Sequence, residues 1–140
     1  MAATFTPPQV LEVTAADSPD FAGVLAVWRA VDAEIGPDDP PIPAEELGAE
    51  LFLPPPDRRK HVWLATLDGV PAGLSVVERH LDGVNEVTAV LYLATDPARR
   101  HRGVGRALAR ACLPAIAAAG GTSVLGWATS PAGAAFSREL

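Results

Sequence analysis

Two glycines stand among arginines between Asp96 and Arg110, and this combination suits the binding of a phosphate group. Glycine carries no Cβ, so at Gly103 and Gly105 an anion can approach the main-chain N–H groups closely. A helix that begins here adds unpaired N–H groups and the positive end of its dipole. Arg100 and Arg102 add charge at the rim of this turn. The segment as a whole is basic, with five arginines within twelve residues: Arg99, Arg100, Arg102, Arg106 and Arg110. These residue types predict a pyrophosphate site, and the alternative for the arginines is a solvated basic face.

A net positive charge is confined to this part of the chain. Residues 1–96 hold 5 Lys/Arg against 16 Asp/Glu, a balance of −11, whereas residues 97–140 hold 6 Arg against one Glu, a balance of +5. Together these give the formal net charge of −6. Nucleic-acid binding requires a broad positive face, which this balance argues against. A mostly acidic protein with one basic segment indicates a small anionic ligand instead.

Two common phosphate-binding motifs do not fit this stretch. A Walker loop requires Gly-Lys-Ser/Thr, and the only lysine of the chain is Lys60. A dinucleotide fingerprint requires a third glycine or an alanine where this chain has Leu108, and it follows an N-terminal strand. Both motifs are therefore excluded.

The hydrophobic pattern predicts one mixed α/β domain, as expected for 140 residues. The pair Asp68-Gly69 between two apolar runs predicts a β-hairpin. The expected order is β-α-α-β-β-β-α-β-α, with strands two to four antiparallel and the last strand reached by a parallel crossover. The predicted strands lie near residues 10–14, 62–67, 72–79, 85–95 and 123–127, and the helices near 19–35, 44–52 and 103–119 and from 131 onward. The basic stretch thus lies between a strand and a helix.

Cysteine content and hydropathy limit the cellular location and the kinds of covalent or metal cross-link that the protein can have. A single cysteine, Cys112, excludes an internal disulfide and a zinc site built on several thiolates. No apolar run approaches the ~18–20 uncharged residues that a bilayer crossing needs. The N-terminus lacks a basic segment followed by an apolar core. We expect a cytoplasmic protein without a metal site, with Cys112 and the three tryptophans, Trp28, Trp63 and Trp127, in the core.

The segment Arg100-His101-Arg102-Gly103-Val104-Gly105, three residues after Asp96-Pro97, resembles the acetyl-CoA-binding motif of the GNAT superfamily, the Gcn5-related N-acetyltransferases. The element order and the Asp68–Gly73 hairpin are similar to that family as well. Ser130–Phe136 resembles the N-terminal half of tandem, actinobacterial-type GNAT proteins. The resemblance implies a single GNAT-like acyl-CoA N-acyltransferase domain over residues 1–140.

The resemblance also implies roles for individual residues. A splayed strand would offer main-chain groups to the acetyl and pantetheine part of acetyl-CoA, and the turn and helix start would bind its pyrophosphate. The implied activity is acetyl transfer to an amine of a small molecule or protein. The implied cofactor-binding residues are Leu93, Ala94 and Thr95 on the strand, and Arg100, His101, Arg102, Gly103, Val104, Gly105 and Arg106 on the turn and helix.

The catalytic residues are less well defined. Glu86 is the candidate general base, the alternative being an exposed strand carboxylate. The family often carries a tyrosine on the last helix as general acid, but this chain has Ser137 in that position. The family also continues after the residue equivalent to Leu140 with two more strands. A fragment, a homodimer or a second GNAT domain would account for that difference. The alternative function is a non-catalytic acyl-CoA-binding half of a tandem protein.

Overall fold

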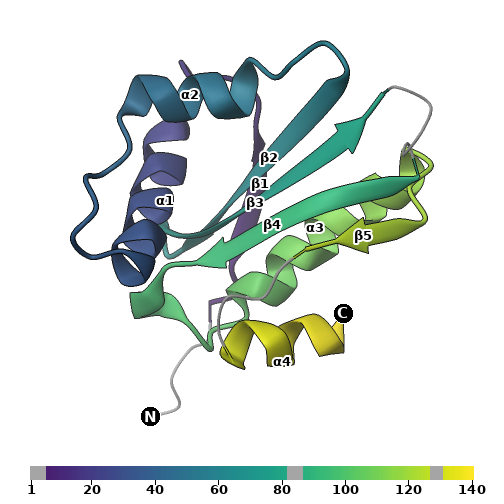
Figure 1. The fold of residues 1–140 in the computed structure, drawn as a ribbon. Coiled ribbons are helices and arrows are strands. Elements are labelled where there is room, and N and C mark those ends of the chain that lie inside the picture. Colours follow the sequence, from purple (N-terminus) through teal and green to yellow (C-terminus); the bar gives the residue numbers. More distant parts are fainter. Residues whose placement is uncertain (1–5, 82–86, 127–130) are drawn as a thin grey trace.

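The computed structural model describes residues 6–81, 87–126 and 131–140, and in it a five-stranded sheet lies between helices (Figure 1). α1 and α2 cover one face of the sheet and α3 the other, with α4 beside the start of α3. The elements are β1 Gln9–Val13, α1 Phe21–Ile35, α2 Ala44–Phe52, β2 Arg58–Leu67, β3 Val70–His80, β4 Thr88–Thr95, the 3-10 turn Pro97–Arg99, α3 Val104–Ala118, β5 Ser123–Leu125 and α4 Pro131–Glu139.

The strand order is β1-β2-β3-β4-β5. All neighbours are antiparallel except β4 and β5, which are parallel and joined through α3. The predicted α/β class, element order, antiparallel meander and parallel crossover are therefore confirmed.

The β2–β3 hairpin turns at Asp68 and Gly69, whose φ angles are 50° and 78°. Two left-handed residues in succession suit a tight hairpin turn, as the Asp-Gly pair predicts. β2 begins earlier than its predicted start at residue 62, because its charged first part continues the ladder with β3. There Arg58 and Lys60 form ion pairs with Glu78 across the strands, at 3.2 and 3.6 Å.

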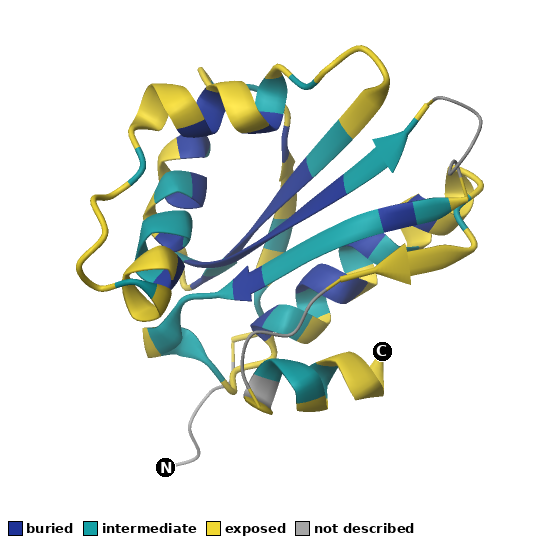
Figure 2. Ribbon diagram, in the orientation of Figure 1, coloured by how far each residue is buried: buried dark blue, intermediate teal, exposed yellow. Residues whose placement is uncertain are grey.

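Apolar side chains fill the space on both faces of the sheet, and the buried residues line these inner faces (Figure 2). Cys112 of α3 and Trp63 of β2 are buried between α3 and the sheet as predicted, and Trp28 of α1 is half-buried against the other face. Burial raises the pKa of the Cys112 thiol, which fits a core residue. Trp127 lies outside the described residues.

Gly73 lets α3 lie close to the sheet. A Cβ built on Gly73 falls 2.5 Å from a methyl carbon of Val104 and 3.1 Å from one of Leu108. Real Cβ atoms do not approach so closely, so any side chain here would push the start of α3 outward.

Within the described ranges, no helix is long and apolar enough to cross a membrane. Nor do those ranges contain a group of three or more His, Cys, Asp or Glu side chains arranged to hold a metal ion.

Candidate functional site

Among the described residues, no strand pairs with one edge of the second half of β4. β4 pairs with β5 only from Thr88 to Val90, whereas its pairing with β3 continues to Thr95. The Asp96 N–H donates to the Ala72 carbonyl at 2.8 Å. Because main-chain groups alternate in direction along an antiparallel strand, those of Leu93 and Thr95 point away from β3, toward the unpaired edge. Those of Ala94 point toward β3.

A short, tightly held turn connects this strand to α3. Asp96 accepts a hydrogen bond from the Ala98 N–H at 2.9 Å and pairs with the Arg99 guanidinium at 2.8 Å. His101 and Gly103 both have left-handed backbones, with φ of 63° and 81°. Left-handed residues in a turn direct successive N–H groups to one side, which is the geometry of a backbone anion site.

The first turn of α3 adds unpaired N–H donors. Ala107 donates to the Gly103 carbonyl at 3.0 Å. The N–H groups of Val104, Gly105 and Arg106 precede that bond and have no partner within the helix. A Cβ built on Gly103 meets no atom within 4 Å, so the space beside it is open. Bare donors, open space and the positive end of the helix fit an anion such as a diphosphate.

The two glycines of the turn differ in their surroundings. A Cβ on Gly105 would lie 3.2 Å from the Phe136 ring of α4 and 3.6 Å from Leu93. We expected Gly105, like Gly103, to make room for an anion, but its bare side faces another part of the protein. Glycine at this position lets α4 pack against α3.

The arginines differ as well. Arg100 forms a bidentate pair with Glu34 of α1, at 2.7 and 2.8 Å. This hydrogen bonding lowers the pKa of the Glu34 carboxyl and raises that of Arg100. Arg106 pairs with Glu139 at 3.2 Å. Arg102 is exposed, and no partner for its guanidinium occurs in the described segments. Sequence reasoning missed the Glu34 contact, because 66 residues separate the partners.

Of the two positions considered for catalysis, Glu86 lies outside the described residues. Ser137 is exposed, and its hydroxyl donates to the Ala134 carbonyl of its own helix at 2.9 Å. Tyr92, the only tyrosine, lies on β4 with its ring 5.0 Å from that of Trp28. Burial and the nearby Asp32 carboxylate raise the pKa of Tyr92 to about 12. Its phenol therefore stays protonated at neutral pH.

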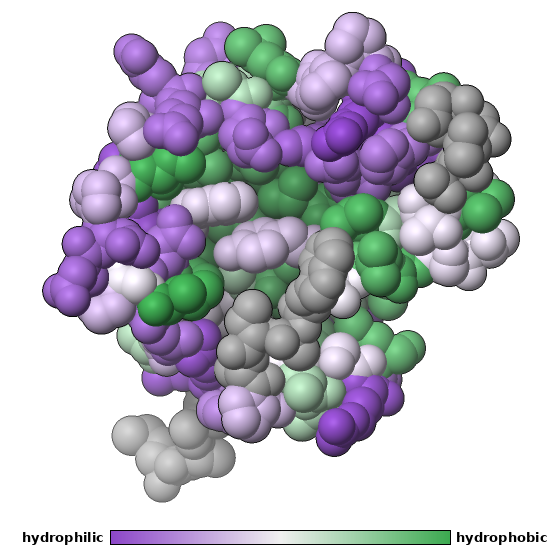
Figure 3. Space-filling model, in the orientation of Figure 1, coloured by the Kyte–Doolittle hydropathy of each residue, from purple (hydrophilic) through white to green (hydrophobic). Residues whose placement is uncertain are grey.

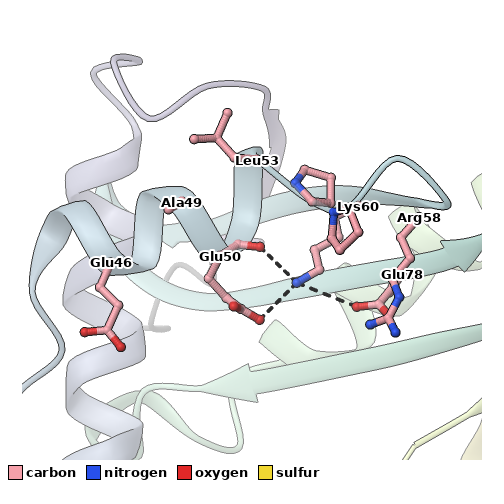
Figure 4. A pocket seen from close by; sticks show the side chains of 9 residues that line it. Glu46, Ala49, Glu50, Leu53, Arg58, Lys60 and Glu78 are labelled. Carbon is pink, nitrogen blue, oxygen red and sulfur yellow. Dashed lines mark hydrogen bonds and ion pairs between the residues drawn. The ribbon is translucent and has the colours of Figure 1, made fainter.

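A charged pocket of about 420 Å³ lies between α2 and the adjoining ends of β2 and β3 (Figure 4). The Lys60 ammonium, whose side chain is only 10% exposed, contacts the Glu50 carboxylate at 3.1 Å and the Glu50 carbonyl at 2.9 Å. Glu78 faces Lys60, Arg58 and His80. Figure 3 shows hydrophilic residues gathered over this part of the molecule, above a hollow that contains hydrophobic ones. In the pocket, the basic groups are already paired with carboxylates of the chain.

A five-stranded mixed sheet with a glycine turn at the start of its crossover helix defines an acyltransferase-like α/β fold. A sequence model described as the acetyltransferase (GNAT) family matches residues 27–138. This match covers well over half of the 140 residues, so the chain belongs to the GNAT family. No curated protein sequence matches the chain.

Solved structures show the same fold. A tandem GNAT protein from the clavulanic acid biosynthesis pathway superposes with a TM-score of 0.77 at 25% identity, over 94% of this chain and 42% of its own. An aminoglycoside acetyltransferase from an uncultured soil metagenomic sample gives a TM-score of 0.73 at 19% identity, over 94% of this chain and 86% of its own. A ribosomal-protein-alanine N-acetyltransferase from Brucella melitensis gives 0.70 at 12% identity, over 95% and 90%.

Proposed function

We propose that this chain binds acetyl-CoA along the free edge of β4 and at the start of α3, and that it transfers the acetyl group to an amine of a small molecule or protein. Membership of the GNAT family supports acetyl transfer in general. A solved neighbour, AAC(6')-Iy, was crystallised with a CoA-based bisubstrate analogue, which supports CoA as the donor.

The observation that carries the proposal is that unpaired main-chain groups lie on both sides of one short turn, at the end of β4 and at the start of α3. Main-chain groups of Leu93 and Thr95 face the unpaired edge, and the N–H groups of the first turn of α3 follow after Gly103. The strand edge would hold the acetyl and pantetheine part, and the helix start and Arg102 would hold the diphosphate. Bound there, acetyl-CoA would supply an activated thioester, and the N–H groups on the strand edge would polarise its carbonyl.

Two measurements on one preparation test this proposal. Isothermal titration calorimetry with CoA measures binding, and thiol release from acetyl-CoA with a panel of amines measures transfer. We expect saturable binding at one site together with amine-dependent thiol release. Absence of CoA binding would refute the proposed donor site.

Glu86 remains the proposed general base, which must accept the proton that the amine loses. The variant Glu86→Gln keeps the side-chain shape and removes the basic carboxylate. We expect it to lower turnover strongly while the Kd for CoA stays the same. Unchanged turnover would remove Glu86 from the mechanism.

A second candidate function is a non-catalytic, CoA-binding unit that supports a neighbouring GNAT domain, in the same chain or in a second copy. Ser137 favours this second function. Its hydroxyl donates to the Ala134 carbonyl, and an aliphatic hydroxyl is a much weaker acid than the phenol that the family often has at this position. This chain covers 42% of the tandem GNAT neighbour, whose remaining length is enough for a second domain of similar size. CoA binding without thiol release for any amine would support this second function.

A further inference from the structure

The guanidinium of Arg100 faces α1. Its two terminal nitrogens donate to both oxygens of Glu34, at 2.8 and 2.7 Å. A bidentate pair of this kind fixes both the distance and the orientation of the two side chains. This contact uses two of the five guanidinium N–H groups and directs the outer end of the Arg100 side chain toward α1.

The last turns of α1 are themselves tied to neighbouring elements. Arg29 donates two hydrogen bonds, at 3.1 and 2.9 Å, to the carbonyl of Ile42 in the segment that leads into α2. The Trp28 ring lies 5.0 Å from that of Tyr92 on β4. These contacts hold α1 against its neighbours within about two turns of Glu34.

The turn needs such a support because His101, next to Arg100, has a φ of 63°. A residue other than glycine keeps a left-handed backbone only where the surrounding structure holds it there. The Asp96–Arg99 pair at 2.8 Å holds the turn before this residue, and the Arg100–Glu34 pair joins it to α1.

We infer that Arg100 is a positioning residue that acts through Glu34, joining the donor turn to α1, and that it does not bind the phosphates itself. The inference rests on the proposed function, because it assigns the diphosphate to that turn. The direct contacts then fall to the N–H groups at the start of α3 and to Arg102.

Four variants test it by calorimetry with CoA at physiological salt: Glu34→Gln, Arg100→Gln, the double variant, and the exchanged pair Glu34→Arg/Arg100→Glu. If Arg100 acts through Glu34, the first three weaken CoA binding by the same factor, about two- to fivefold for a half-exposed pair. The exchanged pair joins the same two elements and brings the Kd back to within about twofold of the original.

A direct phosphate contact gives the opposite pattern. Arg100→Gln then weakens binding at least about tenfold more than Glu34→Gln, because a charge-assisted contact is lost. The exchanged pair binds worst of all, because it places a carboxylate beside the diphosphate. Either result overturns the inference.

Matched controls separate position from net charge. Asp32→Asn on α1 and Arg110→Gln on α3 make the same charge changes at exposed residues with no ion-pair partner among those described. We expect both to leave the Kd within about twofold. Unfolding midpoints of all variants show whether a loss of affinity reflects a loss of fold.

Hydrogen exchange measured without CoA tests the positioning role of Arg100 independently of the proposed function. Glu34→Gln and Arg100→Gln should speed exchange in residues 96–104 to the same extent, and the two controls should not. If the unaltered protein bound no CoA, the proposed function would fail while this result still supported the positioning role. Unchanged exchange in both variants would refute the positioning role.

Discussion

The pocket under α2 and the turn before α3 both gather charge, but they use it differently. In the pocket, Lys60 and Arg58 contact Glu50 and Glu78 across three elements. At the turn, the open side of Gly103 and the exposed Arg102 have no such partners within the described segments. In the pocket, the basic side chains already form ion pairs within the protein. At the turn, donors without such partners are available to a ligand. For this reason the proposed anion site is based on the unpaired donors of the turn and not on the hollow under α2.

The variant Gly103→Val is expected to have the largest effect. A β-branched residue at φ 81° is strained, and its side chain enters the space proposed for the diphosphate. We expect the CoA affinity, measured by calorimetry, to fall on the order of a hundredfold. Gly69→Val is the matched control, because Gly69 also has an open side and a φ of 78°, but lies in the β2–β3 hairpin. Equal affinities in the two variants would contradict the role of Gly103.

Arg102→Gln should give the next largest effect. Loss of one charge-assisted contact to a phosphate predicts a roughly tenfold weaker Kd for CoA with little change in stability. High salt should reduce the difference from the original protein, because the contact is exposed. Arg110→Gln serves as the comparison, and a similar loss there would mean that general charge, rather than this position, governs binding.

The variant Lys60→Met tests how much the ion pairs of the pocket under α2 contribute to stability. The substitution keeps the apolar stem and removes the cation between Glu50 and Glu78, so Glu50 loses its ion pair while Glu78 keeps Arg58. We expect the free energy of unfolding in urea to fall by about 1–2 kcal/mol, with no change in CoA affinity. Weaker CoA binding in a folded variant would mean that the pocket and the turn are coupled.

Titration of Tyr92 should give the smallest effect, and it probes a partly buried phenol. Its pKa of about 12 lies above the ordinary value near 10, so the neutral phenol favours the folded state. This contribution is fully present below pH 10 and is lost as the pH rises through 12. Absorbance near 295 nm follows this sole tyrosine directly. Asp32→Asn should lower the midpoint slightly, and an ordinary midpoint in the unaltered protein would contradict the burial of the ring.

Local pattern was enough to predict most of the fold. Apolar spacing predicted α1, whose described bounds are Phe21–Ile35, and the Asp68-Gly69 pair predicted the hairpin. The start of β2 was missed, because Arg58–Lys60 is polar and its place in the sheet depends on contacts with Glu78, far along the chain.

For the candidate site, the sequence indicated where the turn lies, but not which of its residues face open space and which contact other parts of the protein. From the glycine spacing we predicted that Gly103 and Gly105 both make room for an anion. In the structure, Phe136 of α4 packs against Gly105, and only Gly103 has an open side. Motif reasoning likewise assigned Arg100 to the phosphates, and a Glu34 partner on another helix follows only from the tertiary structure. The assignment of the cofactor-binding residues remains a prediction.

Gly73 has a consequence for how substitutions in this protein are interpreted. It lies on β3, yet it sets how near the first residues of α3 approach the sheet. A methyl group added there would tilt the helix entrance and redirect its amide hydrogens. Such a variant would then behave as a ligand-binding defect in a screen, although the altered residue never touches the ligand.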